Sequence, residues 1–141
     1  MEKYNHIKYF KPYELLYSQT AKVRGIDNCP VNWHIYSNLF YLANMLDYLR
    51  TVYGRPLIIT SGYRCAALNK AVGGVKYSRH LFGLAVDIRC LHNTDYEKIY
   101  QFIGKYAHFI KYYKNKHYIH VDFTREILVS FYHNNISAYE K

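Results

Sequence analysis

The feature that most constrains the fold is a long stretch of helical periodicity between residues 31 and 52. Apolar side chains recur there at spacings of three and four residues, which places them on one face of a helix. The positions are Ile35, Leu39, Leu42, Ala43, Leu46 and Leu49. Gly54 follows the pattern, and a glycine just beyond the last periodic residue is a typical helix stop. The stretch predicts one helix of about six turns.

Short apolar runs in the rest of the chain predict strands. Strands are expected at residues 57–60 and 84–89, and a hairpin at 109–113 and 117–123 around the turn 114–116. Shorter helices are expected at residues 13–19, 64–72 and 95–106, with a loop at 25–30 and a short helix or strand after residue 125. Strands and helices do not alternate regularly, so the predicted class is α+β. We expect one domain over residues 1–141, with its core at about 10–123, in which helices flank a small antiparallel sheet.

The composition is that of a chain that can bury its own core. Half of the 141 residues are apolar or aromatic, and no stretch approaches the roughly 20 apolar residues that a transmembrane helix needs. Residues 1–10 lack the basic-then-apolar pattern of a secretory signal peptide, so we expect synthesis in the cytoplasm without such a signal. The three cysteines, Cys29, Cys65 and Cys90, are an odd number without C-x-x-C spacing, which argues against a disulfide scaffold or a cysteine-rich zinc site.

The net charge of +9 comes from 19 lysines and arginines against 10 aspartates and glutamates. Such a surface favours polyanions, whether nucleic acid, an anionic membrane or an acidic cell wall, but it also serves simple solubility. The basic residues are scattered rather than gathered in a run, so nucleic acid is not the expected partner.

Two chemically distinctive side chains lie seven residues apart in the segment 78–87. His80 and Asp87 are not neighbours on a helix, so they can meet only if a bend brings His80 beside a strand that carries Asp87. Gly83 is well placed to allow that bend. Catalytic zinc takes three protein ligands from His, Asp or Glu and keeps a fourth position for water. This pair would supply two of the three ligands.

The third ligand is expected from the last predicted strand, residues 117–123. Strand alternation gives this segment one apolar face and one polar face. The two faces are Ile119, Val121 and Phe123 against Tyr118, His120 and Asp122. The apolar face belongs to the core, so the polar face can look into a site, with His120 as the ligand and Asp122 beside it.

The same residues carry a family resemblance. The pattern Ser78-x-His80-x-x-Gly83-x-Ala85-x-Asp87 resembles the S-x-H-x-x-G-x-A-x-D signature of zinc D-alanyl-D-alanine carboxypeptidases and related peptidoglycan peptidases. Lysostaphin-type peptidases and the hedgehog signalling domain share the fold of this family. The resemblance extends to residues 59–64, 69–74 and 120–122, and residues 25–28 are similar to small, often phage-encoded members. It covers about residues 10–123 and implies the fold and zinc-dependent activity of the family.

The resemblance implies roles for five residues. His80, Asp87 and His120 match the positions of the three zinc ligands. Arg64 matches an arginine that meets the substrate or polarises its carbonyl, and a guanidinium fork suits a carboxylate or a developing oxyanion. Ser78 matches a position that bonds the substrate backbone. The alternatives are a surface charge at a helix start for Arg64 and a turn cap for Ser78.

The general base is where the sequence departs from the family pattern. Many relatives carry Glu or Asp three residues before the last ligand, whereas this chain has His117 there. A neutral imidazole can accept a proton near neutral pH, but strand alternation turns His117 away from His120. Asp122 faces the site by parity and could act as the base or orient a ligand histidine. Both residues remain candidates.

These observations predict a monomeric enzyme that uses one zinc ion to hydrolyse an amide bond in peptidoglycan stem peptides, as a carboxypeptidase or an endopeptidase. The expected place of action is the bacterial cell wall, in the manner of a phage lysis or virion-associated enzyme. The main alternative is a non-catalytic zinc module that recognises wall fragments or a protein partner. A basic nucleic-acid-binding domain is a third interpretation, and it leaves the histidine and aspartate pattern unexplained.

Overall fold

A four-stranded antiparallel sheet and a long helix organise the computed structural model, which describes residues 8–136. The strands are β1 (Leu57–Ser61), β2 (Ala85–Cys90), β3 (Phe109–Tyr113) and β4 (Tyr118–Asp122). The helices are α1 (Gln19–Arg24), α2 (Trp33–Tyr53), α3 (Ala66–Ala71), α4 (Tyr96–Gly104) and α5 (Arg125–Asn135), with 3-10 helices η1 (Pro12–Leu16), η2 (Arg79–Phe82), η3 (Asn93–Asp95) and η4 (Lys114–Lys116). The predicted α+β class is confirmed. None of the helices in residues 8–136 has the length and apolar character that a membrane crossing requires.

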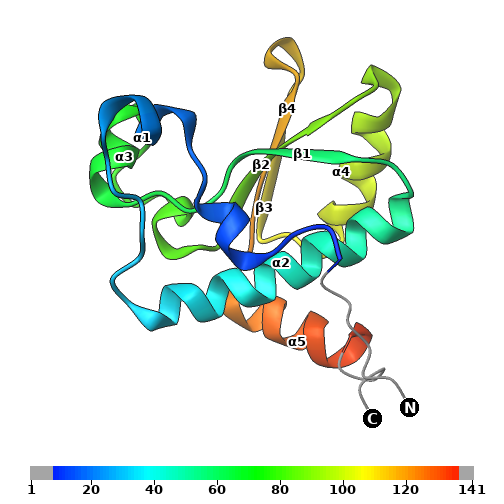
Figure 1. Cartoon of the computed structure of the whole chain (residues 1–141). Helices are drawn as coiled ribbons and strands as arrows, with labels where there is room; N and C mark the ends of the chain where they lie inside the picture. The colour runs from blue at the N-terminus through cyan, green and yellow to red at the C-terminus, as the bar shows by residue number, and fades with distance from the viewer. Residues whose placement is uncertain (1–7, 137–141) are drawn as a thin grey trace.

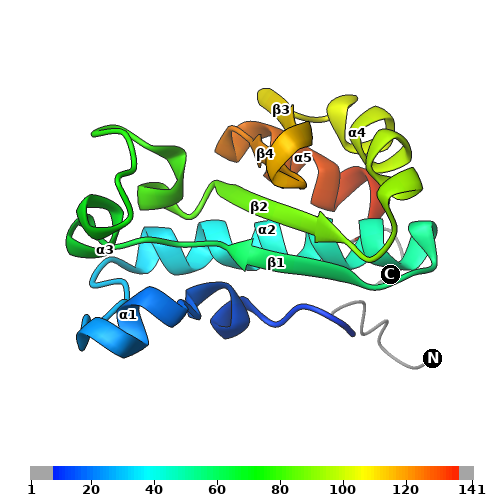
Figure 2. The same cartoon turned by 90° about the horizontal axis from the view of Figure 1, so that it is seen from above.

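Helix α2 is the central support of the sheet. The side chain of Asn32 caps its first turn, and Gly54 ends it in the left-handed conformation (φ 83°). Its leucines at positions 39, 42, 46 and 49 are at most 1% exposed, and burial of each contributes about 1.5–3 kcal/mol. Figure 1 shows α5 alongside α2, and Figure 2 shows β1 and β2 lying over it. The long periodic stretch in the sequence therefore forms the helix against which the sheet packs.

The sheet has the strand order β1-β2-β4-β3, with every neighbouring pair antiparallel. The predicted hairpin is present, since β3 and β4 pair on either side of η4. Alternate residues of the two central strands are fully buried in the core: Val86, Ile88, Ile119 and Val121. The residues between them are therefore presented on the opposite face, away from the core.

The N-terminal segment differs from the expected single helix over residues 13–19. The 3-10 helix η1 ends at Leu16, Tyr17 is extended (ψ 135°), and a separate helix α1 begins after Ser18. The hydroxyl oxygen of Ser18 accepts a hydrogen bond from the backbone N–H of Ala21 (3.2 Å). Ser18 therefore acts as an N-cap that starts a new helix, where the prediction had one helix running through it.

A buried asparagine fixes this segment to the rest of the domain. The side-chain amide of Asn28 donates to the carbonyl oxygens of Leu16 (2.8 Å) and Tyr63 (2.9 Å). Its own oxygen accepts from the backbone N–H of Cys65 (2.7 Å). These bonds hold α1 beside α3 at one end of the sheet (Figure 2), which is the end where the candidate site lies.

Candidate metal centre

The register of β2 and β4 brings two of the predicted ligands side by side. Asp87 lies directly opposite His120 in this antiparallel pair, on the face turned away from the core. Cβ atoms at directly opposite positions are about 4.5–5.5 Å apart, so the two side chains must meet. The distance between Asp87 Oδ1 and His120 Nδ1 is 3.0 Å.

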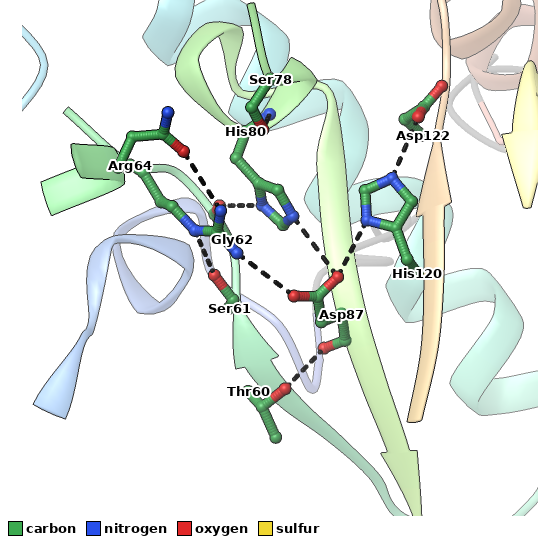
Figure 3. Close-up of polar contacts among 10 residues, drawn as sticks. Thr60, Ser61, Gly62, Arg64, Ser78, His80, Asp87, His120 and Asp122 are labelled. Carbon is green, nitrogen blue, oxygen red and sulfur yellow. Dashed lines mark hydrogen bonds and ion pairs between the residues drawn. The ribbon is translucent and has the colours of Figure 1, made fainter. Parts of the chain in front are cut away.

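A short turn positions the third predicted ligand, His80. The 3-10 helix η2 begins after Ser78, whose hydroxyl oxygen accepts from the backbone N–H of His80 (3.2 Å), and ends at Gly83 in the left-handed conformation (φ 70°). This bend returns the chain into β2 and leaves His80 only 2% exposed. His80 Nε2 lies 3.4 Å from Asp87 Oδ1, and ligand atoms of His80, Asp87 and His120 all lie within 4.8 Å of one another (Figure 3).

The hydrogen bonds of His80 leave a ring nitrogen directed at a carboxylate, an arrangement that suits a cation. His80 Nδ1 lies 2.7 Å from the carbonyl oxygen of Gly62, which can only accept, so the proton is on Nδ1 and Nε2 presents a lone pair. This Nε2 is buried and has no hydrogen-bond partner among the described residues, yet it faces a carboxylate oxygen of Asp87. Two acceptors that face each other at a largely buried position repel unless a positive charge lies between them. The donor set of two imidazoles and one carboxylate is one that zinc accepts.

The ionisation of Asp87 and His120 also favours a cation at this cluster. Burial alone would favour the neutral form of Asp87, but its hydrogen bond with His120 and the two neighbouring imidazoles outweigh it and hold the pKa of this carboxyl well below its usual range. Asp87 is therefore ionised at neutral pH. His120 is also partly buried, which opposes its charged form, but hydrogen bonds to Asp87 and Asp122 raise its pKa above the ordinary value.

Asp122 contacts the ring nitrogen of His120 that faces away from Asp87. Its Oδ2 lies 3.0 Å from His120 Nε2, and its side chain is only 9% exposed. When Nε2–H donates to Asp122, the lone pair of Nδ1 is directed toward Asp87 and His80. Such a carboxylate fixes the tautomer and the ring orientation of a ligand histidine. The structure thus places Asp122 beside His120, as strand parity predicts.

Arg64 holds the second oxygen of Asp87. Its Nη2 lies 3.4 Å from Asp87 Oδ2, while Nε donates to Ser61 Oγ (3.0 Å) and Nη1 donates to Asn69 Oδ1 (3.2 Å). A bulge in β1 sets Ser61 opposite Asp87 and so makes this arrangement possible. Three of the five guanidinium N–H donors are thereby used within the protein. Arg64 is therefore part of the framework of the site, rather than a charge at a solvent-exposed helix start.

Two supporting residues, Asn69 and Gly74, were not predicted as members of the site. Asn69 is buried, accepts from Arg64 and donates to the carbonyl oxygen of Val75 (2.8 Å), so it ties the loop after α3 to the guanidinium. A Cβ on Gly74 would overlap the side chain of Asn69 and crowd that of Arg64, so any other residue there would displace these two side chains. The signal was present in the similarity of residues 69–74 to the family, but nothing in the sequence alone assigned it a contact.

A cavity of about 590 Å³ opens over the cluster. Its lining includes all three candidate ligands together with Arg64, Ser78 and Asp122. The remaining lining residues are Val72, Gly73, Gly74, Val75, Tyr77, Arg79, Phe109, Tyr113, Lys116 and Tyr118. Asp87 and Asp122 are thus the only carboxylates that line the cavity within the described part of the chain, and arginine, lysine and tyrosine side chains form much of its wall.

His117 is the one predicted site residue that the structure does not bring to the cavity. It precedes β4 in the left-handed conformation (φ 56°), its side chain is exposed, and it is not among the residues that line the cavity. Its carbonyl oxygen accepts from the hydroxyl of Tyr96 (2.7 Å). A base at this position would have to face His120. The left-handed backbone of His117 does not turn its side chain that way.

An α+β domain with a histidine–aspartate–histidine cluster at the floor of an open cavity defines a candidate metallohydrolase. Residues 8–122 match the profile of the family described as Peptidase M15, and the chain belongs to this family. M15 peptidases are zinc-dependent, which agrees with the group formed by His80, Asp87 and His120. Comparison with curated proteins and with solved structures found no match.

Proposed function

We propose that the chain hydrolyses an amide bond in peptidoglycan stem peptides, with one zinc ion held by His80 Nε2, His120 Nδ1 and the carboxylate of Asp87. The observation that carries this proposal is the buried His80 Nε2, which faces Asp87 with no hydrogen between them. Zinc bound there would lower the pKa of a water molecule and polarise the scissile carbonyl. We place the action at the bacterial cell wall, in the setting of a phage lysis or virion-associated enzyme, since a chain of net charge +9 is attracted to an anionic wall.

The side chains around the ligands supply the rest of the chemistry. Asp122 binds His120 through one oxygen, so its other oxygen can accept a proton from water, and we assign it as the general base in preference to His117. Arg64 keeps two N–H donors beyond those used for Ser61, Asn69 and Asp87, and these can stabilise negative charge on the carbonyl oxygen.

Ser78 can serve the turn and the substrate at once. Its oxygen accepts from His80, which leaves its own O–H to donate to a substrate carbonyl. Hydrolysis then adds hydroxyl to the carbonyl carbon, breaks the C–N bond and delivers a proton to the leaving amine.

The placement of His117 keeps a second candidate function in view. A chain that holds zinc but lacks an effective base would be a non-catalytic module that recognises wall fragments or a protein partner. The exposed position of His117 favours that alternative, whereas Asp122 inside the cavity favours catalysis. The two differ in one measurable property, because the module binds zinc stoichiometrically and cuts nothing.

Mass spectrometry of purified muropeptides digested with the zinc-loaded protein tests the proposal. We expect new fragments whose masses add up to substrate plus water, and their loss in Asp87→Ala. The matched control is Asp95→Asn, since Asp95 is a buried aspartate outside the cavity that pairs with Arg55 (3.2 Å). Zinc-loaded wild-type protein that leaves every muropeptide intact would exclude the enzyme and support the module.

A further inference from the structure

A second cavity borders the metal centre on the side of β1. It measures about 240 Å³ and is lined by residues of α1, β1 and α3; we call it the β1-side cavity. The larger cavity of about 590 Å³ is called the β4-side cavity. Arg64, Val72 and Asp87 line both of them. The two hollows therefore meet at the carboxylate that we assign to the metal.

The two cavities extend to opposite sides of Asp87. In Figure 3, Thr60 and Ser61 lie on one side of this carboxylate, and His120 and Asp122 lie on the other. The strand order agrees, because the β1-side cavity lies at the outer strand β1 and the β4-side cavity lies over β4 and β3. Neighbouring strands are about 4.8 Å apart, so a path across all four strands is about 14 Å long, the length of about four extended residues.

The linings of the two cavities differ in charge. Outside the three shared residues, the β1-side cavity is lined by hydroxyl, amide and leucine side chains: Ser18, Gln19, Thr20, Thr60, Ser61 and Leu68. The β4-side cavity adds the cations Arg79 and Lys116 and one carboxylate, Asp122. The first cavity therefore suits uncharged groups, and the second suits a residue that bears a carboxylate.

We propose, building on the peptidase function proposed above, that this enzyme is an endopeptidase whose substrate crosses the sheet with at least two residues on each side of the bond that is cut. A carboxypeptidase needs a site that ends one residue beyond the scissile bond, with a cation that captures the terminal carboxylate. Arg64 stands where the cavities meet, but three of its donors are used by Ser61, Asn69 and Asp87, and the remaining two are assigned above to the carbonyl oxygen of the bond that is cut. The open space continues past Arg64 into the β1-side cavity. The bound peptide can therefore extend more than one residue beyond the bond that is cut.

The products of stem-peptide digestion distinguish the two modes. Water adds across an internal amide, so mass spectrometry will show two fragments that each contain at least two residues. Amidation of the substrate's C-terminus will change kcat/KM by less than about threefold, whereas loss of a captured carboxylate costs about tenfold or more. Release of the terminal residue alone, abolished by amidation, would overturn the endopeptidase assignment while leaving the peptidase function intact. Absence of any cleavage would refute the peptidase function itself.

Filling the β1-side cavity gives an independent test. Gln19→Trp places a bulky ring at its rim, and Val23→Trp is the matched control, because Val23 is 74% exposed on the same helix and lines neither cavity. We expect Gln19→Trp to lower kcat/KM for internal cleavage about tenfold or more and Val23→Trp to leave it within about twofold.

Binding can be followed without catalysis. A stem peptide whose scissile amide is replaced by a reduced CH₂–NH linkage is titrated into isotope-labelled wild-type protein, and the backbone amide signals of Thr20 and Thr60 are expected to shift. Equal kinetics for the two tryptophan variants, together with unmoved signals of Thr20 and Thr60, would show that substrate does not occupy the β1-side cavity.

Discussion

Replacing Asp122 by asparagine or alanine tests how the site orients its last ligand. Asp122 Oδ2 lies 3.0 Å from His120 Nε2, on the side of the ring opposite Asp87. Asparagine keeps an oxygen that can accept from Nε2–H but removes the negative charge. Alanine removes both, so Nε2–H loses its partner and the ring is free to rotate. Zinc affinity should therefore fall in two steps along this series.

The magnitude follows from the burial of this pair. The Asp122 side chain is 9% exposed, so solvent screens its interaction with His120 only weakly. Carboxylates that orient a ligand histidine are worth about 10–100-fold in metal affinity, or about 1.4–2.7 kcal/mol. We expect zinc to bind about tenfold more weakly to Asp122→Asn and about 100-fold more weakly to Asp122→Ala.

Competition with a chromophoric chelator at neutral pH measures these affinities directly. Asp95→Asn is the control, because it also removes a buried carboxylate charge but lies at Arg55, outside the cavity. It should lower stability and leave zinc affinity unchanged. If both Asp122 variants bind zinc as tightly as the wild type, then the contact between Asp122 and His120 Nε2 does not orient the ring, and this part of our account is wrong.

Three further predictions concern the metal, a glycine and a thiol. Zinc at about 1,000 times its dissociation constant should stabilise the stripped protein by about 4 kcal/mol and raise the calorimetric unfolding midpoint by roughly 8–16 °C; an unchanged midpoint would contradict specific binding. Gly74→Ala should destabilise the fold by about 1–3 kcal/mol in denaturant titrations and impair hydrolysis, because its Cβ meets Asn69. Gly73→Ala meets no atom within 4 Å, so its only cost is the left-handed backbone (φ 73°), about 1–2 kcal/mol, and it should keep its activity; equal hydrolysis by the two variants would argue against this role of the loop. Burial raises the pKa of Cys90 to about 11, so its alkylation at mildly alkaline pH should be roughly 100-fold slower in the folded than in the unfolded protein, as followed by peptide mass spectrometry; similar rates would mean that the thiol is accessible.

The fold could be predicted where a local pattern carried the information. The periodicity of residues 31–52 and the stop at Gly54 predict α2, and apolar alternation predicts β4. The break between η1 and α1 could not be predicted in the same way. The carbonyl oxygen of Leu15 accepts from the backbone N–H of Tyr63 (2.9 Å), and this long-range bond ends the first turn where local propensity would continue it.

The candidate site was predictable as a set of residues but not as a geometry. Spacing and alternation single out His80, Asp87 and His120, yet the direct pairing of Asp87 with His120 depends on strand register, which no local pattern fixes. The contacts of Arg64 depend on a bulge in β1, which no local sequence pattern predicts. For Ser78 the sequence left open a turn cap or a substrate contact; the structure shows the cap, and the substrate contact stays a proposal.

Anomalous diffraction at the zinc edge, from crystals of the protein grown with zinc, tests the central claim most directly. Our account predicts one ion at about 2.0–2.2 Å from His80 Nε2, His120 Nδ1 and a carboxylate oxygen of Asp87. An ion bound elsewhere, or a His80 ring whose Nε2 bonds to a protein group in zinc-saturated crystals, would contradict it.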